Sequence, residues 1–117
     1  MRSISFALTE RQFLDGTKTV TRRVGWHTLK PGTLLRAVRK CQGLKKGEKQ
    51  NVLGIIRVVS ARQERLWAIN TCDVRREGFP GMSSDEFITF FGQTHKGANQ
   101  NTMVTRIEFE KVTECKP

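Results

Sequence analysis

The sequence predicts an α+β fold: a small, mostly antiparallel β-barrel with short helices covering its open ends. Two observations carry this prediction. Several short segments alternate apolar and polar residues with a period of two, as strands do. The links between them are too short for the crossover helices of a parallel sheet. The 117 residues are enough for one hydrophobic core, so we expect a single domain over residues 1–117.

The strands are expected at residues 3–8, 33–39, 52–61 and 103–110. Gly54 lies inside the third segment and predicts a bulge or a sharp bend there. Each segment has one apolar side, and these sides are expected to meet. We therefore expect one core built from Ile4, Phe6, Leu8, Ile56, Val58, Ile107 and Phe109.

Short helices are predicted between the strands by their capping residues. Residues 9–12 (Thr-Glu-Arg-Gln) and 83–86 (Ser-Ser-Asp-Glu) both have the pattern of a capping box. Asp15 and Gly16 should end the first helix, and Thr71 is a candidate N-cap for a helix that ends before Gly78. Phe87, Ile88 and Phe91 share a face of the last helix and are expected in the core.

Composition excludes several classes of protein. No apolar run approaches the ~20 residues of a membrane-spanning helix, and the N-terminus does not have the pattern of a secretory signal. Cys41, Cys72 and Cys115 are scattered without a CxxC pair, which gives no reason to expect zinc or another cofactor. These features favour a protein of the reducing cytoplasm that does not act at a membrane.

The charge is large and unevenly distributed. The net charge is +10, and residues 1–58 carry all of it, with 13 basic and 3 acidic side chains. Such asymmetry favours an electropositive face that binds a polyanion, with nucleic acid as the default partner. Two alternatives stay open: a solvated basic surface that only promotes solubility, and a basic face that binds an acidic protein partner.

Residues 16–23 (Gly-Thr-Lys-Thr-Val-Thr-Arg-Arg) are the most informative segment. Glycine allows a ligand to approach the backbone, cations bind phosphate, and hydroxyls add hydrogen bonds. Spacing alone favours an exposed basic strand equally well. The candidate ligand-binding residues of the segment are Gly16, Thr19, Arg22 and Arg23.

Residues 16–23 resemble the G-x-K-x-x-T-x-R signature of ASCH domains. The order of elements along nearly the whole chain is similar too, from Lys30-Pro31-Gly32 before a strand to the Glu77-Gly78-Phe79 helix end. The resemblance implies a PUA-like β-barrel with a cleft for nucleic acid or a modified nucleoside. Several members of that family are acetylcytidine amidohydrolases; others are proposed RNA binders or nucleases.

The amidohydrolase resemblance implies a catalytic set of Lys18, Thr21 and Glu77. A lysine with a lowered pKa would accept the threonine proton, and Thr21 would attack the amide carbonyl. Glu77 would relay a proton or orient the lysine, although a structural ion pair between Glu77 and Lys18 or Arg75 is an equal alternative. Residues 18 and 21 point to opposite faces of a regular strand, so the signature must bend or end a strand.

Further candidates lie around this segment. Trp26 could stack a base, and Lys45, Lys46 and Lys49 could grip phosphates from a glycine-bracketed loop. His95 could act as an acid or a base, although a lone exposed histidine more often does neither. The sequence thus favours binding of RNA or a modified nucleoside through a basic cleft, with amide hydrolysis by the Lys/Thr/Glu set as the alternative.

Overall fold

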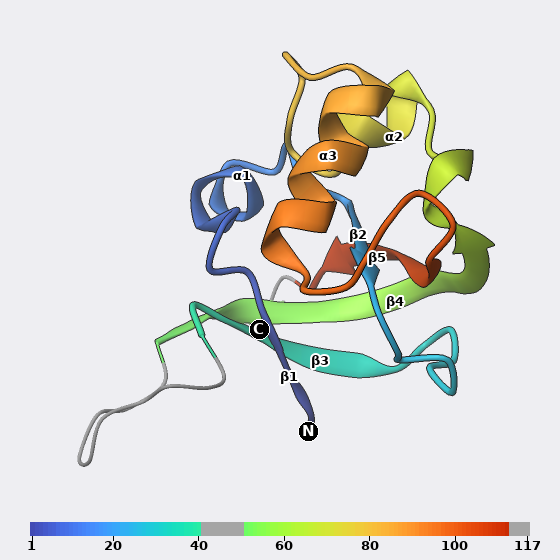
Figure 1. The fold of residues 1–117 in the computed structure, drawn as a ribbon. Helices are drawn as coiled ribbons and strands as arrows, with labels where there is room; N and C mark the ends of the chain where they lie inside the picture. The colour runs from blue at the N-terminus through green and yellow to red at the C-terminus, as the bar shows by residue number, and fades with distance from the viewer. Residues whose placement is uncertain (41–50, 113–117) are drawn as a thin grey trace, which may run out of the picture.

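The computed structural model describes residues 1–40 and 51–112. Strands and short helices alternate along the chain, and the helices gather on one face of a sheet (Figure 1). The elements are β1 (Ser3–Ser5), α1 (Glu10–Leu14), β2 (Val20–Arg23), β3 (Leu34–Val38), β4 (Val52–Arg65), η1 (Leu66–Ala68), α2 (Thr71–Arg76), α3 (Ser84–Thr94) and β5 (Met103–Lys111). Within these described residues, no helix is long and apolar enough to cross a membrane.

The five strands form one mixed sheet in the order β1-β3-β4-β5-β2. Three of the pairings are antiparallel, and β1 pairs with β3 in parallel. The α+β class is confirmed, but the expected barrel is not, because the sheet is open. The edge strands β1 and β2 are instead joined through a side chain: Arg23 Nη2 donates a hydrogen bond to the carbonyl oxygen of Ser5. A side-chain hydrogen bond thus spans the seam where a barrel would close.

The longest strands form a ribbon that carries the rest of the sheet. β4 and β5 pair from Ile56–Lys111 at one end to Arg65–Met103 at the other. β4 is longer than the segment predicted from the sequence and carries the chain up to η1 and α2. The register of β3 with β4 shifts beside Gly54, which confirms the irregularity predicted there. Gly54 has a φ of 159°, close to ordinary extended backbone.

The helix caps follow the sequence in one case and not in another. Ser83 and Glu86 form a complete capping box at the start of α3. The box predicted at residues 9–12 is wrong, because Thr9 makes no side-chain cap hydrogen bond although α1 begins directly after it. The N-cap of α2 is Asn70 rather than Thr71, and its side chain accepts from the Asp73 amide. Thr9 is instead buried beside a pocket.

Two apolar clusters stabilise the fold. The first lies on the sheet beside α1 and contains six of the seven core residues predicted from the sequence. Leu8 is the exception: it is 63% exposed, because β1 ends at Ser5 and the chain turns before Leu8. The second cluster joins η1, α2 and α3 to β5, and consists of Leu66, Ile69, Val74, Phe87, Phe91 and Val104.

Candidate functional site

A pocket of about 200 Å³ lies at the open seam of the sheet, between the chain around β1, the segment leading into β2, and α3. This volume is below the roughly 300–1,000 Å³ of a drug-sized ligand site, so the pocket suits a single small group such as one base. One side of it is polar and the other aromatic. The polar side chains that line it include Lys18, Thr21, Arg22, Arg23 and Glu77.

The aromatic wall comes from α3 and the turn before it. Phe79, Phe87, Phe90 and Phe91 line the pocket, and their rings contact one another with centroids 5.1 to 6.3 Å apart. Phe6 lines the opposite side, next to β1. Aromatic faces bind planar apolar groups and tolerate any base, since every base has a π-face. The wall therefore favours a flat ligand.

Lys18 and Glu77 meet because the loop after α1 runs along the end of α2. The Lys18 amide donates to Gln12 O (3.0 Å), and the Thr19 amide donates to Arg76 O (2.8 Å). Glu77 is the C-cap of α2. Lys18 Nζ donates to both the carbonyl oxygen of Glu77 (2.8 Å) and its Oε1 (3.1 Å). Both side chains are buried, so this ion pair forms part of the pocket wall.

The surroundings of Lys18 shift its pKa in both directions. Burial lowers the pKa of the ammonium, Glu77 opposes that shift, and the nearby charges of Arg23 and Arg22 add to it; the net direction is downward. A neutral lysine amine has two N–H groups, and the two Glu77 oxygens accept both. Its lone pair is then left over, and this is the requirement for a base.

Thr21 faces the same pocket as Lys18, as the signature required. Lys18 precedes β2, which begins at Val20, so the two side chains do not follow the alternation of one strand. Thr21 Oγ1 accepts a hydrogen bond from Arg23 Nε at 3.1 Å. A guanidinium at this oxygen stabilises negative charge on it. Thr21 thus lies beside a cation and lines the same pocket as a lysine whose pKa burial lowers.

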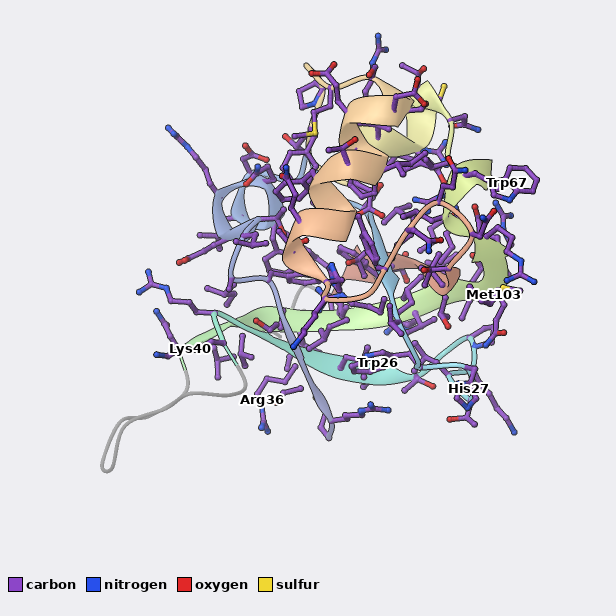
Figure 2. The ribbon with its side chains drawn as sticks, viewed as in Figure 1. Trp26, His27, Arg36, Lys40, Trp67 and Met103 are labelled. Atoms are coloured by element: carbon purple, nitrogen blue, oxygen red, sulfur yellow. The ribbon has the colours of Figure 1, made fainter. Side chains whose placement is uncertain are left out.

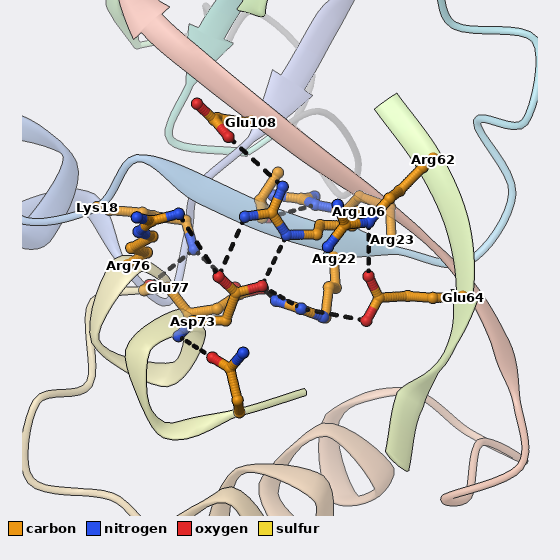
Figure 3. Close-up of polar contacts among 12 residues, drawn as sticks. Lys18, Arg22, Arg23, Arg62, Glu64, Asp73, Arg76, Glu77, Arg106 and Glu108 are labelled. Carbon is orange, nitrogen blue, oxygen red and sulfur yellow. Dashed lines mark hydrogen bonds and ion pairs between the residues drawn. The ribbon is translucent and has the colours of Figure 1, made fainter. Parts of the chain in front are cut away.

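Behind the pocket, the ion pair continues into a buried network (Figure 3). Arg22 Nη1 binds Glu77 Oε2 (3.1 Å), while its Nη2 binds Asp73 Oδ2 (2.5 Å) and Glu64 Oε2 (3.4 Å). Arg106 binds both oxygens of Asp73, at 2.6 and 3.1 Å. Arg22 Nε is buried with no partner among the described residues. Arg22 therefore contacts three carboxylates, those of Glu77, Asp73 and Glu64, on the pocket's inner side.

The contacts of the network shift the pKa values of Asp73 and Arg106. Hydrogen bonds from Arg106 and Arg22 hold the pKa of Asp73 well below its usual range, although burial acts in the opposite direction. The same contact with Asp73 raises the pKa of Arg106. Asp73 is therefore ionised and fully bonded, which suits a structural role.

The other residues proposed from the sequence lie away from the pocket. Gly16 has a φ of 85° and is exposed; Thr19 is also exposed, with its backbone tying β2 to α2 and β5. Neither they nor Trp26 line the pocket. Trp26 packs against the first apolar cluster and is covered by the guanidinium of Arg2, 3.6 Å from its ring centroid. The loop residues Lys45, Lys46 and Lys49 lie outside the described residues.

Sequence patterns do not identify the aromatic wall or the carboxylate that organises the network, and they favour an inert, exposed position for His95, which is half-buried and lines the pocket. The helical spacing assigns Phe87 and Phe91 to the core; they belong to it, but they also line the pocket. Phe91 follows Phe87 by four residues and His95 follows Phe91 by four, so the three share one helix face. That spacing is a sequence signal that could have grouped His95 with the two phenylalanines. No local pattern marks Asp73, whose partners are 33 and 51 residues away.

Solved structures share this fold. A protein from Enterococcus faecalis V583 assigned to the family DUF984 matches with a TM-score of 0.63 at 16% identity, over 90% of this chain and 70% of that one. An ASCH domain from Lactobacillus crispatus JV V101 matches with a TM-score of 0.63 at 13% identity, over 89% and 70%. The hypothetical protein PH0355 matches with a TM-score of 0.63 at 16% identity, over 95% and 96%.

No protein-family model and no curated protein matches the chain. At these identities the structural likeness concerns the fold alone. The resemblance to ASCH domains that residues 16–23 predicted is confirmed at that level: this chain has the fold of an ASCH domain.

Proposed function

We propose that the protein binds an acylated nucleoside of the acetylcytidine type in the pocket and hydrolyses its amide bond. The observation that carries the proposal is the convergence of Lys18, Thr21 and Glu77, which are distant in sequence, on one small pocket with an aromatic wall. The fold likeness to an ASCH domain supports it, since the resemblance to that family implied Lys18 and Thr21 through residues 16–23 and Glu77 through the Glu-Gly-Phe helix end.

The reaction follows from the contacts of each group. Neutral Lys18 Nζ takes the hydroxyl proton of Thr21, and Thr21 Oγ1 forms a bond to the acetyl carbon. Arg23, whose Nε already donates a hydrogen bond to Oγ1, stabilises the negative charge on that oxygen as its proton leaves. The bond between the acetyl carbon and the cytosine amine nitrogen breaks, and Lys18 returns the proton to that nitrogen. Water then releases acetate and restores Thr21.

Glu77 positions the lysine in this scheme. The backbone carbonyl oxygen and Oε1 of Glu77 orient Lys18 Nζ. The negative charge of Glu77 raises the pKa of Lys18 and so opposes the effect of burial. Arg22 in turn fixes the other carboxylate oxygen of Glu77. The aromatic wall would stack the cytosine ring.

The test is release of acetate from acetylcytidine by the purified protein. Lys18→Arg should abolish turnover, because arginine does not deprotonate in a protein, while folding is retained. Thr21→Ala should do the same, whereas Thr21→Ser keeps the hydroxyl and should keep part of the activity. Lys30→Arg, an exposed lysine outside the pocket lining, is the matched control. A wild type without turnover, or an active Lys18→Arg, would overturn the enzymatic function.

RNA binding is the second candidate, and the uneven charge favours it. The basic excess of residues 1–58 includes Arg36, which points away from α3 on the outer side of β3 (Figure 2). Binding of RNA oligonucleotides should weaken with salt. Replacing Lys45, Lys46 and Lys49 together by Ala should reduce the salt slope by up to about three units, roughly 0.7–0.9 for each phosphate that these lysines neutralise. A titration without binding at low salt would reject this candidate.

A further inference from the structure

His95 closes the aromatic side of the pocket. It is the C-cap of α3 and lines the cavity together with Lys18, Thr21 and Glu77. Its half-buried ring stacks flat on Phe91, with centroids 3.8 Å apart and planes 6° from parallel. The stacking and the helix backbone hold the imidazole in one orientation, which a solvated surface histidine does not have.

The hydrogen bonds of His95 determine which ring nitrogen carries the proton. Nδ1 lies 3.1 Å from the carbonyl oxygen of Phe91 and 3.0 Å from Thr94 Oγ1. A carbonyl oxygen only accepts, so Nδ1 is the N–H of the neutral ring. The Thr94 hydroxyl donates to the carbonyls of its own helix, which leaves its lone pairs for Nδ1. Nε2 is therefore the basic nitrogen, and the hydrogen bonds of His95 within the described residues leave it unused.

The neighbours of His95 favour the neutral ring. Burial lowers the pKa of the imidazole; the Phe91 carbonyl opposes this, Arg23 lowers the pKa further, and Glu77 raises it slightly. Lys18 and Arg22 are the remaining charged groups that line the cavity. A ring that stays neutral near pH 7 can accept a proton.

The two sides of the pocket offer different groups to a water molecule. In the proposed reaction the cytosine ring leaves the aromatic side first. The space that it vacates is bordered by phenylalanines, Thr94 and His95. Thr94 is engaged with backbone carbonyls, so His95 Nε2 is the group on that side able to take a proton. On the polar side, Glu77 anchors Lys18, and Thr21 lines the same side of the pocket.

From this arrangement, and resting on the proposed function, we propose that His95 Nε2 is the base that activates the water which releases the acetyl group from Thr21. The water oxygen forms a bond to the acetyl carbon as its proton moves to Nε2. The bond from the acetyl carbon to Thr21 Oγ1 then breaks, and the proton on Nε2 passes to Oγ1. Acetic acid leaves and loses its proton to solvent, so atoms and charges balance.

The experiment separates the two half-reactions with acetylcytidine in a quenched-flow measurement. His95→Gln should release about one equivalent of cytidine per protein rapidly and then turn over at least about a hundred-fold more slowly than the wild type, the lower range for loss of a general base. Mass spectrometry of the quenched variant should find Thr21 acetylated. His27→Gln, an exposed histidine outside the pocket lining, should behave as wild type (Figure 2).

Each outcome decides between the proposals. Wild-type turnover in His95→Gln, or loss of both the burst and the turnover, overturns the assignment of His95 and leaves the hydrolase intact. A wild type without turnover overturns the hydrolase and this inference with it. His95→Asn, whose shorter side chain keeps a polar group at the helix end, repeats the test if His95→Gln does not fold by circular dichroism.

Discussion

Two buried ion pairs, Lys18–Glu77 and Asp73–Arg106, both contact the guanidinium of Arg22. Comparing them shows how a candidate functional pair differs from a structural one. Lys18–Glu77 lines the pocket, whereas Asp73–Arg106 lies outside the pocket lining, and Arg22 binds both carboxylates. All of these side chains are almost completely buried. Burial alone therefore does not distinguish them.

The difference lies in what is left over after bonding. Asp73 accepts from three guanidinium N–H groups, so its carboxylate is saturated and its pKa is driven down. Lys18 donates twice to Glu77 and has its pKa lowered, which leaves one position of the amine to face the cavity. A buried charge with an unused valence beside a cavity is a candidate for chemistry; a saturated one stabilises the fold.

The largest expected effect is the loss of the saturated pair. Asp73→Ala leaves the guanidinium groups of Arg22 and Arg106 without their shared carboxylate in a buried site. We expect a loss of about 3–5 kcal/mol in the free energy of unfolding, the range for breaking one partner of a buried pair. Urea unfolding measures it, with the exposed Asp85→Ala as control. A loss below about 1 kcal/mol would show that the network is not structural.

Acid should weaken the same pair. Because the folded pKa of Asp73 is far below the unfolded value of about 3.9, its contribution is complete above that pH and declines as the pH falls further. The wild type should therefore lose stability steeply below about pH 4. Asp73→Asn lacks this ionisation, so its stability should fall less over the same interval. If the free energies of unfolding of the two proteins fall by the same amount over this pH interval, Asp73 does not have the lowered pKa assigned to it.

Sequence reasoning predicts the fold through local patterns and misses what depends on contacts distant in sequence. Period-two alternation places Ile4, Phe6, Ile107 and Phe109 in one core correctly. Arg106, however, falls on the polar side of the last predicted strand and is buried, because α2 brings Asp73 over that side of β5. Nothing in the neighbouring sequence indicates a partner 33 residues away.

The candidate site is also predictable only in part, because some of its residues lie in local motifs and others are defined by contacts distant in sequence. Residues 16–23 carry a compact signature, so Lys18 and Thr21 can be named from the sequence, and Glu77 through the motif at the end of a helix. The predicted barrel closure is not found because side chains at the seam, not backbone pairing, join β1 to β2. The aromatic wall has the pattern of a core, since a phenylalanine that lines a pocket has the same helical spacing as one that fills a core.

The pocket-side pair should respond to alkali with a gain in stability, whereas the saturated pair responds to acid with a loss. The folded pKa of Lys18 is lower than its unfolded value of about 10.4, so the unfolded chain binds the proton more readily. Burial of this lysine therefore costs stability at neutral pH, and the cost disappears as the pH rises from the folded pKa toward about 10.4. Lys18→Met lacks this contribution, so the stability of the wild type relative to the variant should increase between those values. Urea titrations of both proteins over that interval measure it, and a constant difference would contradict the lowered pKa.

The smallest effect on stability is expected at the rim of the pocket, where sequence reasoning places a core residue. Leu8 is 63% exposed and lines the cavity, whereas Leu35 is buried in the sheet's core at 1%. Leu35→Ala should cost about 2–5 kcal/mol, the range for a buried leucine. Leu8→Ala should change the free energy of unfolding by less than about 0.5 kcal/mol, as substitutions at exposed positions do.

Since Leu8 borders the pocket, the same variant should alter the KM for acetylcytidine while leaving the kcat near that of the wild type, because it touches none of the reacting groups. A large loss of stability in Leu8→Ala would return this residue to the core and show that the chain does not turn out of β1 where the structure has it.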